Sequence, residues 1–465
     1  YGLKTWSVPT PIGGGPVSIE VAGMLAKTTY HMSALVQYQN GTLANDIDHT
    51  FTTGSLPNVG GVAQPGPFAP KLTATTPTGM TPQTGIELVN SYGGTAAGVY
   101  ATDLNGNVIW TYPFQDQQPG SAITGVKTLP NGDMVMDIGV LSGLPLTAPT
   151  SSTAQVVIRE IDLVGKTVRQ VTLTQMNAAL AAAGFNVTLT DFHHDIEPLP
   201  NGHLLVMANT LKSVTLTGAS SPTTVLGDVV VDLDPNWKPV WIWNEFDHLD
   251  VNRHPYMFPD WTHSNAIIYS SDDGNFIVSI RHQNWLVKVN YANGTGDGSV
   301  IWRLGEDGDF TLMNNGAVDT NPADWFYAQH GPSFVGTGNA GIFNLVLMDN
   351  GDDREFAAGV TCGAAGAPAC LYSTVPEMQI NESTMTATLI FQQILPPALY
   401  NNFGGNAEVL QNSNVEYDLC GVGSNADVFE VAPNSQAQTV WQFQSHGTNL
   451  YRAFRVPSLY PGVQW

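Results

Sequence analysis

Basic residues are scarce in this chain of 465 residues, where 16 Lys and Arg stand against 39 Asp and Glu and the formal net charge is −23. Proteins that bind nucleic acid neutralise its phosphates with massed Lys and Arg, so this composition argues against a nucleic-acid partner. No apolar run approaches the ~20 residues that a membrane-spanning helix needs. With 43% hydrophobic residues the chain is not disordered either. The composition therefore indicates a large, acidic globular protein.

Several functional motifs are missing as well. The sequence has no G-x-x-x-x-G-K-[ST] loop, no G-x-G-x-x-G after a strand and no G-x-S-x-G nucleophile turn. The absent phosphate loop argues against a nucleotide-linked donor. The Asp-rich segment Asp349–Arg354 lacks the full EF-hand pattern. We expect a turn with an internal Asp–Arg contact there, and no metal or cofactor.

Only three cysteines are present. Cys362 and Cys370 flank a Gly/Ala/Pro loop, and in an oxidising compartment they can close it as a disulfide. Cys420 is then expected to be a buried free thiol. Very low lysine content with abundant Thr, Asn, Gly and Ser indicates an exported protein, periplasmic or extracellular. The chain begins at Tyr1 without a signal-peptide pattern, as a processed chain or a fragment would.

The first 64 residues form a region of their own. The stretch TTYHMSALVQYQNG…HTFTTGSLP resembles the second half of an immunoglobulin-like or fibronectin-III sandwich. A full sandwich takes roughly 90–100 residues, so several strands are missing. Either they lie upstream of residue 1, or a neighbouring molecule completes the sheet by strand addition and the protein is a homo-oligomer. A Pro/Thr-rich linker, residues 65–85, follows this partial sandwich.

Residues 86–465 carry a repeat that predicts the fold. Its first element is a polar turn followed by a strand that often ends in Trp. Its second is a Gly turn followed by an apolar strand. Short strands, Gly/Asn turns and a Trp at a fixed place are typical of propeller blades, so we predict an all-β fold, a six-bladed β-propeller. The copies of the first element are Asp103–Trp110, Asp162–Val171, Asp232–Trp243, Val289–Trp302, Gln379–Ile390 and Val431–Trp441. Those of the second are Leu129–Met136, Leu199–Met207, Asp272–Ile280, Gly341–Met348 and Gly405–Leu410. Helix is expected only at Thr174–Ala183.

Three histidines occupy equivalent places in successive repeats. Aligned on the Gly turns, His194, His263 and His330 match the position of Thr124 in the preceding repeat. That position opens the innermost strand of a blade, which borders the central channel. We therefore expect the three imidazoles to converge on the propeller axis.

Two further residues point to an anion at this axis. Asn265 shares a face with His263, because strand side chains alternate with a period of two. Arg281 ends an apolar strand and is expected to meet a buried anion or to pair with an acidic side chain. The neighbouring His193 should face away from His194 on a regular strand, so this pair cannot chelate one metal. Which of the two lines the site stays open.

The ordered motifs D-F-H-H-D-I-E-P-L-P-N-G, W-T-H-S-N, S-I-R-H-Q, Q-H-G-P, L-M-D-N-G-D-D-R and Y-R-A-F-R-V resemble the nucleotide-independent arylsulfotransferases. The resemblance covers roughly residues 86–460 and extends to the partial Ig-like region and the small disulfide loop. It implies an exported six-bladed enzyme that moves a sulfuryl group between phenols. His330 would be the nucleophile, with His263, His194 and Arg281 as the other catalytic residues.

The expected substrates are an aryl sulfate donor and a phenolic acceptor. Asn265 would donate to the sulfuryl oxygens, and Trp261 and Tyr327 are candidates for an apolar platform under the aryl ring, although ordinary core packing explains them equally well. Two alternatives remain. One is a catalytically idle propeller that acts as a binding or structural surface protein, since fold alone does not decide function. The other is a hydrolase of aryl sulfates that uses water as the acceptor.

Overall fold

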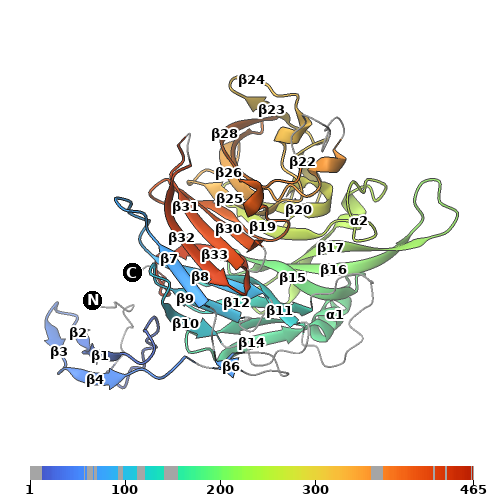
Figure 1. The fold of residues 1–465 in the computed structure, drawn as a ribbon. Coiled ribbons are helices and arrows are strands. Elements are labelled where there is room, and N and C mark those ends of the chain that lie inside the picture. The colour runs from blue at the N-terminus through green and yellow to red at the C-terminus, as the bar shows by residue number, and fades with distance from the viewer. Residues whose placement is uncertain are drawn as a thin grey trace.

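A computed structural model places six β-sheets around one axis, as blades of a propeller (Figure 1). It describes residues 13–56, 58–59, 66–67, 71–92, 98–112, 121–140, 156–357, 370–422, 425–434, 437–461 and 463. The predicted all-β, six-bladed fold is confirmed. The inner strands contact one another in the order β11, β15, β19, β25 and β29, and contacts of β30 with β33 and of β8 with β11 complete the ring.

Each blade is an antiparallel sheet of at least four strands. Blade 1 contains β8 (Ile86–Tyr92), β9 (Gly98–Thr102), β10 (Val108–Tyr112) and β33 (Asn449–Val456), and blade 2 contains β11 (Ser121–Thr128), β12 (Met134–Val140), β13 (Val157–Ile161) and β14 (Thr167–Thr172). Blade 3 contains β15 (Leu189–Pro198), β16 (Leu204–Val214), β17 (Thr223–Leu233) and β18 (Pro239–Asn244), and blade 4 contains β19 (Ser264–Ser270), β20 (Asn275–Ile280), β21 (Trp285–Val289) and β22 (Val300–Leu304). Blade 5 contains β25 (His330–Val335), β26 (Ile342–Met348), β27 (Thr374–Asn381) and β28 (Thr386–Ile394), extended by β23 (Thr311–Asn314), which is parallel to β28, and by β24 (Ala317–Val318). Blade 6 contains β29 (Ala407–Val409), β30 (Val415–Val422), β31 (Asn425–Val431), β32 (Thr439–His446) and β7 (Lys71–Thr75).

The repeated Trp residues hold neighbouring blades together. Each lies on an outer strand and donates its indole N–H to the next blade. Trp110 of blade 1 donates to the Leu163 carbonyl of blade 2 at 2.8 Å. Trp243 of blade 3 reaches Gly298 of blade 4 at 2.9 Å. The same interaction recurs at Trp302 with Glu382 and at Trp441 with Leu104. A buried indole N–H needs an acceptor, which explains the fixed place of Trp in the repeat.

All six copies of the first repeat element lead into an outer strand, as the pattern requires. Four copies of the second repeat element lead into the second strand of a blade, counted from the axis. The fifth, Gly405–Leu410, covers β29, which is the innermost strand of blade 6. The expected helix at Thr174–Ala183 is α1 (Leu173–Ala182), capped by Thr172 and Gln175 in a reciprocal capping box. Of the described helices, none is long and apolar enough to cross a membrane. The remaining helical turns are α2 (Glu245–His248), η1 (Arg281–Gln283), η2 (Ala292–Gly294), η3 (Pro322–Asp324), η4 (Arg354–Phe356) and η5 (Pro397–Leu399).

Distant parts of the chain close the ring. Strand β7 pairs with β32 as the outermost strand of blade 6, while β33 pairs with β8 as the innermost strand of blade 1. Arg455 of β33 is buried at this junction. Its guanidinium contacts the carboxylates of Glu87 on β8 at 2.9 Å, Glu416 on β30 at 2.6 Å and Glu430 on β31 at 3.0 Å. One cation therefore links three carboxylates from two blades.

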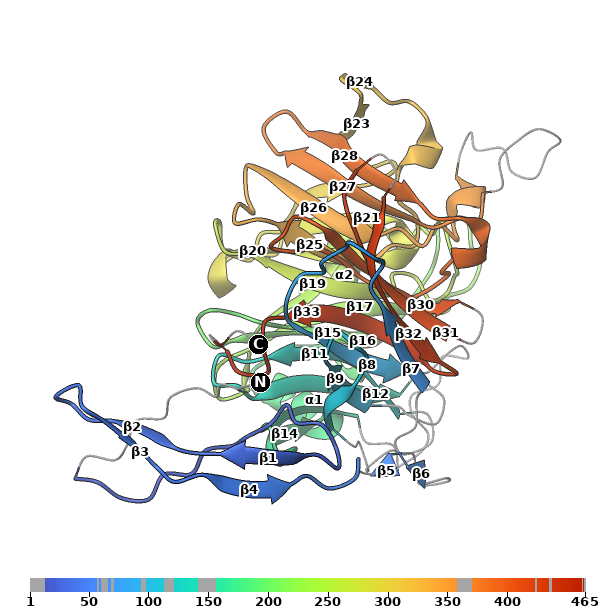
Figure 2. The ribbon, with the colours of Figure 1, turned by 60° about the vertical axis from the view of Figure 1, so that its left-hand side comes forward.

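The N-terminal region is simpler than expected. β1 (Thr29–Met32) pairs with β4 (His49–Thr52), and β2 (Leu35–Gln37) pairs with β3 (Leu43–Asn45), which gives two two-stranded ribbons that project from the blades (Figure 2). β5 (Asn58–Val59) and β6 (Gly66–Pro67) form one more short pair. The Ig-like sandwich is not confirmed. Part of the expected linker, residues 65–85, is strand β7 of the propeller.

Candidate active site

The aligned histidines meet at the axis, as the repeat predicted. The ring centroid of His194 lies 5.0 Å from that of His263 and 5.7 Å from that of Tyr451. Tyr451, on the closing strand β33, also packs 6.4 Å from the ring of His330. Four blades thus contribute one aromatic or imidazole ring each to a single cluster.

Irregular backbone aims these side chains. His194 and His263 have positive φ values of 64° and 49°, a region that residues other than glycine rarely occupy. The register of β15 is interrupted between Phe192 and Ile196, around His194. Because such bulges re-aim side chains, simple alternation along the strand does not apply here. The expectation that His193 faces away from His194 is therefore wrong, since their Nδ1 atoms are hydrogen-bonded to each other.

The two adjacent histidines have different roles. His193 Nε2 lies 3.1 Å from the buried carboxylate of Asp228. Burial alone would lower the pKa of His193, but Asp228 outweighs burial and raises it. His194 instead has a pKa well below its usual value, because it is buried beside other cationic or imidazole groups. Protonated His193 then donates to Nδ1 of neutral His194. His194 therefore keeps its proton on Nε2, and it is His194 that faces His263.

The environment of His330 defines its protonation. Its Nδ1 lies 2.6 Å from Oδ1 of Asn350. The amide nitrogen of Asn350 donates to the carbonyls of Asn401 and Gly404, at 2.9 and 3.1 Å, so the amide oxygen must face His330. That oxygen only accepts, and so Nδ1 carries the proton. Burial and the nearby Arg281 hold the pKa of His330 well below its usual range. His330 is therefore neutral, with its lone pair on Nε2.

Arg281 lies at the centre of a hydrogen-bonded chain. Its Nη2 donates to Asp352 at 2.7 Å, and Tyr256 donates to the same carboxylate oxygen at 2.9 Å. Its Nη1 lies 2.6 Å from Nε2 of His282, which must be the acceptor because a guanidinium only donates. Of the two partners expected for Arg281, a buried anion or an acidic side chain, the acidic side chain is present as Asp352. Its Nε–H is buried and has no partner among the described residues, so one donor is left for a ligand.

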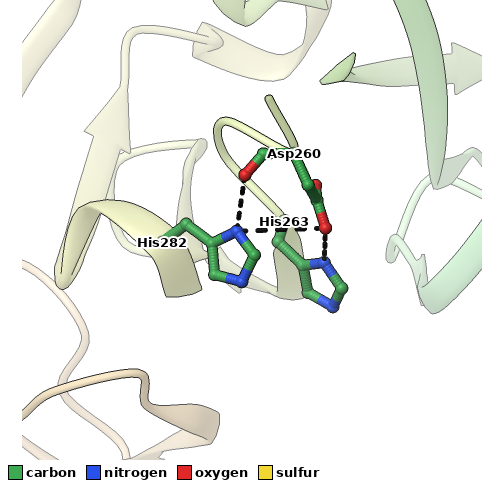
Figure 3. A group of neighbouring side chains, drawn as sticks. All are labelled: Asp260, His263 and His282. Atoms are coloured by element: carbon green, nitrogen blue, oxygen red, sulfur yellow. Dashed lines mark hydrogen bonds and ion pairs between the residues drawn. The ribbon is translucent and has the colours of Figure 1, made fainter. Parts of the chain in front are cut away.

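Asp260 contacts two of the histidines (Figure 3). Its carboxylate Oδ2 lies 2.6 Å from Nδ1 of His263, and its backbone carbonyl accepts from Nδ1 of His282 at 2.7 Å. The rings of His263 and His282 stack with centroids 4.6 Å apart. Potential ligand atoms of the three residues lie within 4.8 Å of one another. Both nitrogens of His282 are already used, one of them by Arg281, so this group is better explained as a hydrogen-bond network than as a metal site.

Asn265 and Arg452 are two further buried residues beside the histidines. Asn265 donates to the Gln329 carbonyl at 2.7 Å, and its backbone carbonyl accepts from the guanidinium of Arg452. Arg452 also contacts Asp195 at 3.3 Å. It is buried and close enough to lower the pKa of His330. Its Nε–H has no partner among the described residues, like that of Arg281. Two buried cations with spare donors suit an anionic ligand.

The remaining predicted residues lie elsewhere. Trp261 is fully buried, stacks on Phe246 at 5.0 Å and donates to the Arg253 carbonyl. Tyr327 is fully buried as well, and its hydroxyl donates to the Pro322 carbonyl at 2.7 Å. Both side chains belong to packing, and the structure does not bring them into the histidine cluster.

Two other predictions concern the segments beside the site. The predicted Cys362–Cys370 pairing lies outside the described residues because Cys362 is not described, and Cys420 is a buried free thiol as expected. The predicted turn at Asp349–Arg354 holds the expected contact between its two end residues.

Several contributors were not singled out from the sequence, among them Tyr451 of the motif Y-R-A-F-R-V. Asp260, His282, Asn350 and Arg452 lie within or beside the motifs W-T-H-S-N, S-I-R-H-Q, L-M-D-N-G-D-D-R and Y-R-A-F-R-V. The only signal for them in the sequence was their position within or next to the aligned motifs. A lone Asp, Asn or Arg near a motif is nonetheless too common for its sequence position to reveal a partner.

Solved structures with a similar arrangement are remote in sequence. A "putative 6-phosphogluconolactonase" of Bacteroides fragilis is 10% identical, with a TM-score of 0.40 over 81% of this chain and 100% of that one. A protein of the same description from Bacteroides uniformis is 8% identical, with a TM-score of 0.38 over 81% and 100%. Hydrazine synthase of Kuenenia stuttgartiensis is 9% identical, with a TM-score of 0.35 over 82% of this chain and 49% of its own. Likenesses at this level carry no functional argument.

The family comparison is far more specific. No curated protein matches the chain. The sequence model of the family described as "Arylsulfotransferase (ASST)" matches residues 72–452, which is most of the chain and includes the residues of the histidine cluster, from His194 to Tyr451 and Arg452. The chain therefore belongs to the arylsulfotransferase family.

Proposed function

We propose that this protein is an exported aryl-sulfate sulfotransferase that moves a sulfuryl group from an aryl sulfate to a phenol through a sulfo-His330 intermediate. The observation that carries the proposal is the state of His330. The imidazole is buried and neutral, Asn350 fixes its proton on Nδ1, and its Nε2 has no hydrogen-bond partner among the described residues. A neutral imidazole nitrogen is a competent nucleophile, and a covalent intermediate splits one difficult transfer into two easier ones.

In the first half-reaction, the Nε2 lone pair of His330 attacks the sulfur of the aryl sulfate. The N–S bond forms as the bond from sulfur to the aryl oxygen breaks. The leaving phenolate then takes a proton from an imidazolium of the site. Negative charge on the three sulfuryl oxygens is met by the spare Nε–H donors of Arg281 and Arg452 and by Nε2–H of His194. Donors fixed in advance towards developing charge lower the barrier.

In the second half-reaction, the acceptor phenol gives its proton to the imidazole that the first step left neutral. Its oxygen attacks the sulfur, and the N–S bond to His330 breaks. His330 returns to its neutral form, so protons and charge balance over the cycle. No nucleotide takes part, because a sulfuryl group bound to an aryl oxygen is already transferable to the histidine. Catalysis rests on position and electrostatics, as in phosphoryl transfer.

The test is to incubate the protein with 4-nitrophenyl sulfate, with and without phenol. Phenol-dependent release of nitrophenol and formation of phenyl sulfate would support transfer. Release that does not depend on phenol would indicate a hydrolase, and no release would favour the idle propeller. Mass spectrometry after donor alone should show about 80 Da, one SO₃ group, on the His330 peptide. His330→Ala should remove both signals without changing the thermal unfolding midpoint.

A further inference from the structure

We infer that Asp260 is a positioning residue that makes His263 the proton carrier of the site, accepting the proton of the acceptor phenol and returning it to the departing phenolate. The inference rests on the proposed function and assigns one of its steps to particular atoms. Asp260 touches no substrate and acts through His263.

The Asp260 carboxylate defines which nitrogen of His263 exchanges protons. A carboxylate accepts, so the 2.6 Å contact with Nδ1 of His263 requires Nδ1–H. Nε2 is then the atom that gains and loses a proton, and it points away from Asp260 (Figure 3). The side chain of His263 is 31% exposed, whereas that of His282 is 0% exposed. Of these two stacked rings, only His263 can meet a substrate.

Asp260 is itself held rigidly. Leu226, on strand β17, accepts from the backbone N–H of Trp261 and donates to the carbonyl of Pro259, each at 3.0 Å. The segment around Asp260 is therefore pinned to the blade as a parallel bridge. The carboxylate of Asp260 forms ion pairs with His263 and His282, and no Lys or Arg among the described residues competes for it. The negative charge is thus available to compensate His263 when its ring is doubly protonated.

The backbone of the same residue orients the sulfuryl-binding cation. The Asp260 carbonyl accepts from Nδ1–H of His282, so Nε2 of His282 is an acceptor for Nη1 of Arg281. Burial holds the pKa of His282 well below its usual value, so it stays neutral and keeps accepting. Asp260 therefore acts in two ways: its side chain supports proton transfer by His263, and its backbone carbonyl orients the groups that stabilise charge. A substitution of the side chain affects only proton transfer, because the backbone carbonyl remains.

The proton balance is closed. At the start His263 carries protons on both nitrogens, and Nε2–H passes to the aryl oxygen as the S–O bond breaks. His263 is then neutral, with Nδ1–H still on Asp260. The acceptor phenol protonates Nε2 as its oxygen attacks the sulfo-histidine, which restores the starting state.

The test compares Asp260→Asn with the parent on two donors. Phenyl sulfate releases a strongly basic phenolate and needs the proton, whereas 4-nitrophenyl sulfate releases a weakly basic one. The rate measured is that of the first half-reaction alone, sulfo-His330 formation in a single turnover without acceptor, because the acceptor step also uses His263 and is common to both donors. We expect this rate to fall on the order of 10²-fold with phenyl sulfate and less than about threefold with 4-nitrophenyl sulfate. His263→Gln should show the same pattern, and the double variant should be no slower than either single one. Equal losses on both donors, no loss, or additive losses would overturn the inference.

Two controls separate position from stability and from metal binding. Asp48→Asn removes a similar 2.7 Å contact with His31 on the projecting β1–β4 ribbon and should leave both donors unaffected. The thermal unfolding midpoint of Asp260→Asn should stay within a few degrees of the parent. If a chelator reproduces the Asp260→Asn pattern and the parent contains stoichiometric zinc that the variant lacks, the group is a metal site and the inference is wrong.

A readout independent of activity separates this inference from the proposed function. With ¹⁵N-labelled histidine, NMR should show neutral His263 of the parent protonated on Nδ1, and Asp260→Asn should lose that preference. A parent that has this tautomer but transfers no sulfuryl group would refute the function and leave the Asp260–His263 assignment in place. A parent with neutral His263 protonated on Nε2 would refute the assignment, whatever the activity.

Discussion

Replacing Arg455 by Met should destabilise the ring closure, and the loss should grow with pH. Arg455 is the buried cation that joins Glu87, Glu416 and Glu430 across blades 1 and 6. Removing one partner of a buried ion pair typically costs about 3–5 kcal/mol, because the other charge is left uncompensated. At pH 8 we expect a loss of that size in the free energy of unfolding.

The pH dependence follows from the acids of this junction. Burial raises the pKa of Glu87 from 4.5 to about 7, and burial with neighbouring carboxylates raises that of Glu416 well above its usual value. The pKa values of these acids are higher in the folded than in the unfolded protein, so the folded protein binds more protons. The free energy of unfolding therefore falls as pH rises from about 4.5 through 7. At pH 5 Glu87 and Glu416 stay protonated, so removal of Arg455 leaves little uncompensated negative charge. Arg455→Met should then lower the free energy of unfolding by only roughly 1–2 kcal/mol.

Urea denaturation followed by circular dichroism at pH 5 and pH 8 measures both numbers. Arg303→Met is the matched control, because Arg303 pairs at 3.3 Å with Asp309 where both side chains are more than a third exposed. Exposed pairs contribute less than about 1 kcal/mol, and this loss should not change with pH. If Arg455→Met costs the same at both pH values, or no more than the control, the argument from stranded carboxylates is refuted.

Four further predictions concern the site and the repeat. Arg281→Lys should reduce transfer on the order of 10²-fold in steady-state assays, since a point charge cannot replace a planar group that donates in several directions. Asn350→Leu should slow sulfo-His330 formation about 10-fold or more in single-turnover mass spectrometry, because nothing then keeps the His330 proton on Nδ1. The acid limb of the pH–rate profile should not report loss of neutral His330 near pH 6.5, since its pKa is far lower. Trp243→Phe should cost about 1 kcal/mol of unfolding free energy, measured by urea, for the lost bond to Gly298.

The sequence predicted the blades well because the physics that defines them is local. A polar turn and a strand recur in all six units, and four of these units end in a Trp whose indole N–H needs only an acceptor on the neighbouring blade. The N-terminal ribbons show the limit of such patterns. Their alternation predicts strands, but it does not reveal whether a second sheet covers them.

For the site, alignment located the residues but not their orientation. His194 and His263 sit at positive φ, where alternation along the strand does not hold. Contacts such as Arg452 with Asn265 join positions far apart in the chain and leave no local pattern. Trp261 was a natural platform candidate by its place beside a motif, but only the packed structure shows that its ring is covered.

The strand order of blade 1 has a consequence for biosynthesis. Tyr451 and Arg452 reach the site on β33, a strand that pairs with β8, whose residues are made more than 350 positions earlier. A nascent chain that has completed five blades still lacks the strand that carries them. Because domains made of such distant pairings fold only once both partners exist, the site should assemble as the last event of folding. Sulfuryl-transfer activity would then indicate that the ring has closed. A chain truncated before residue 449 would have an open ring and no activity.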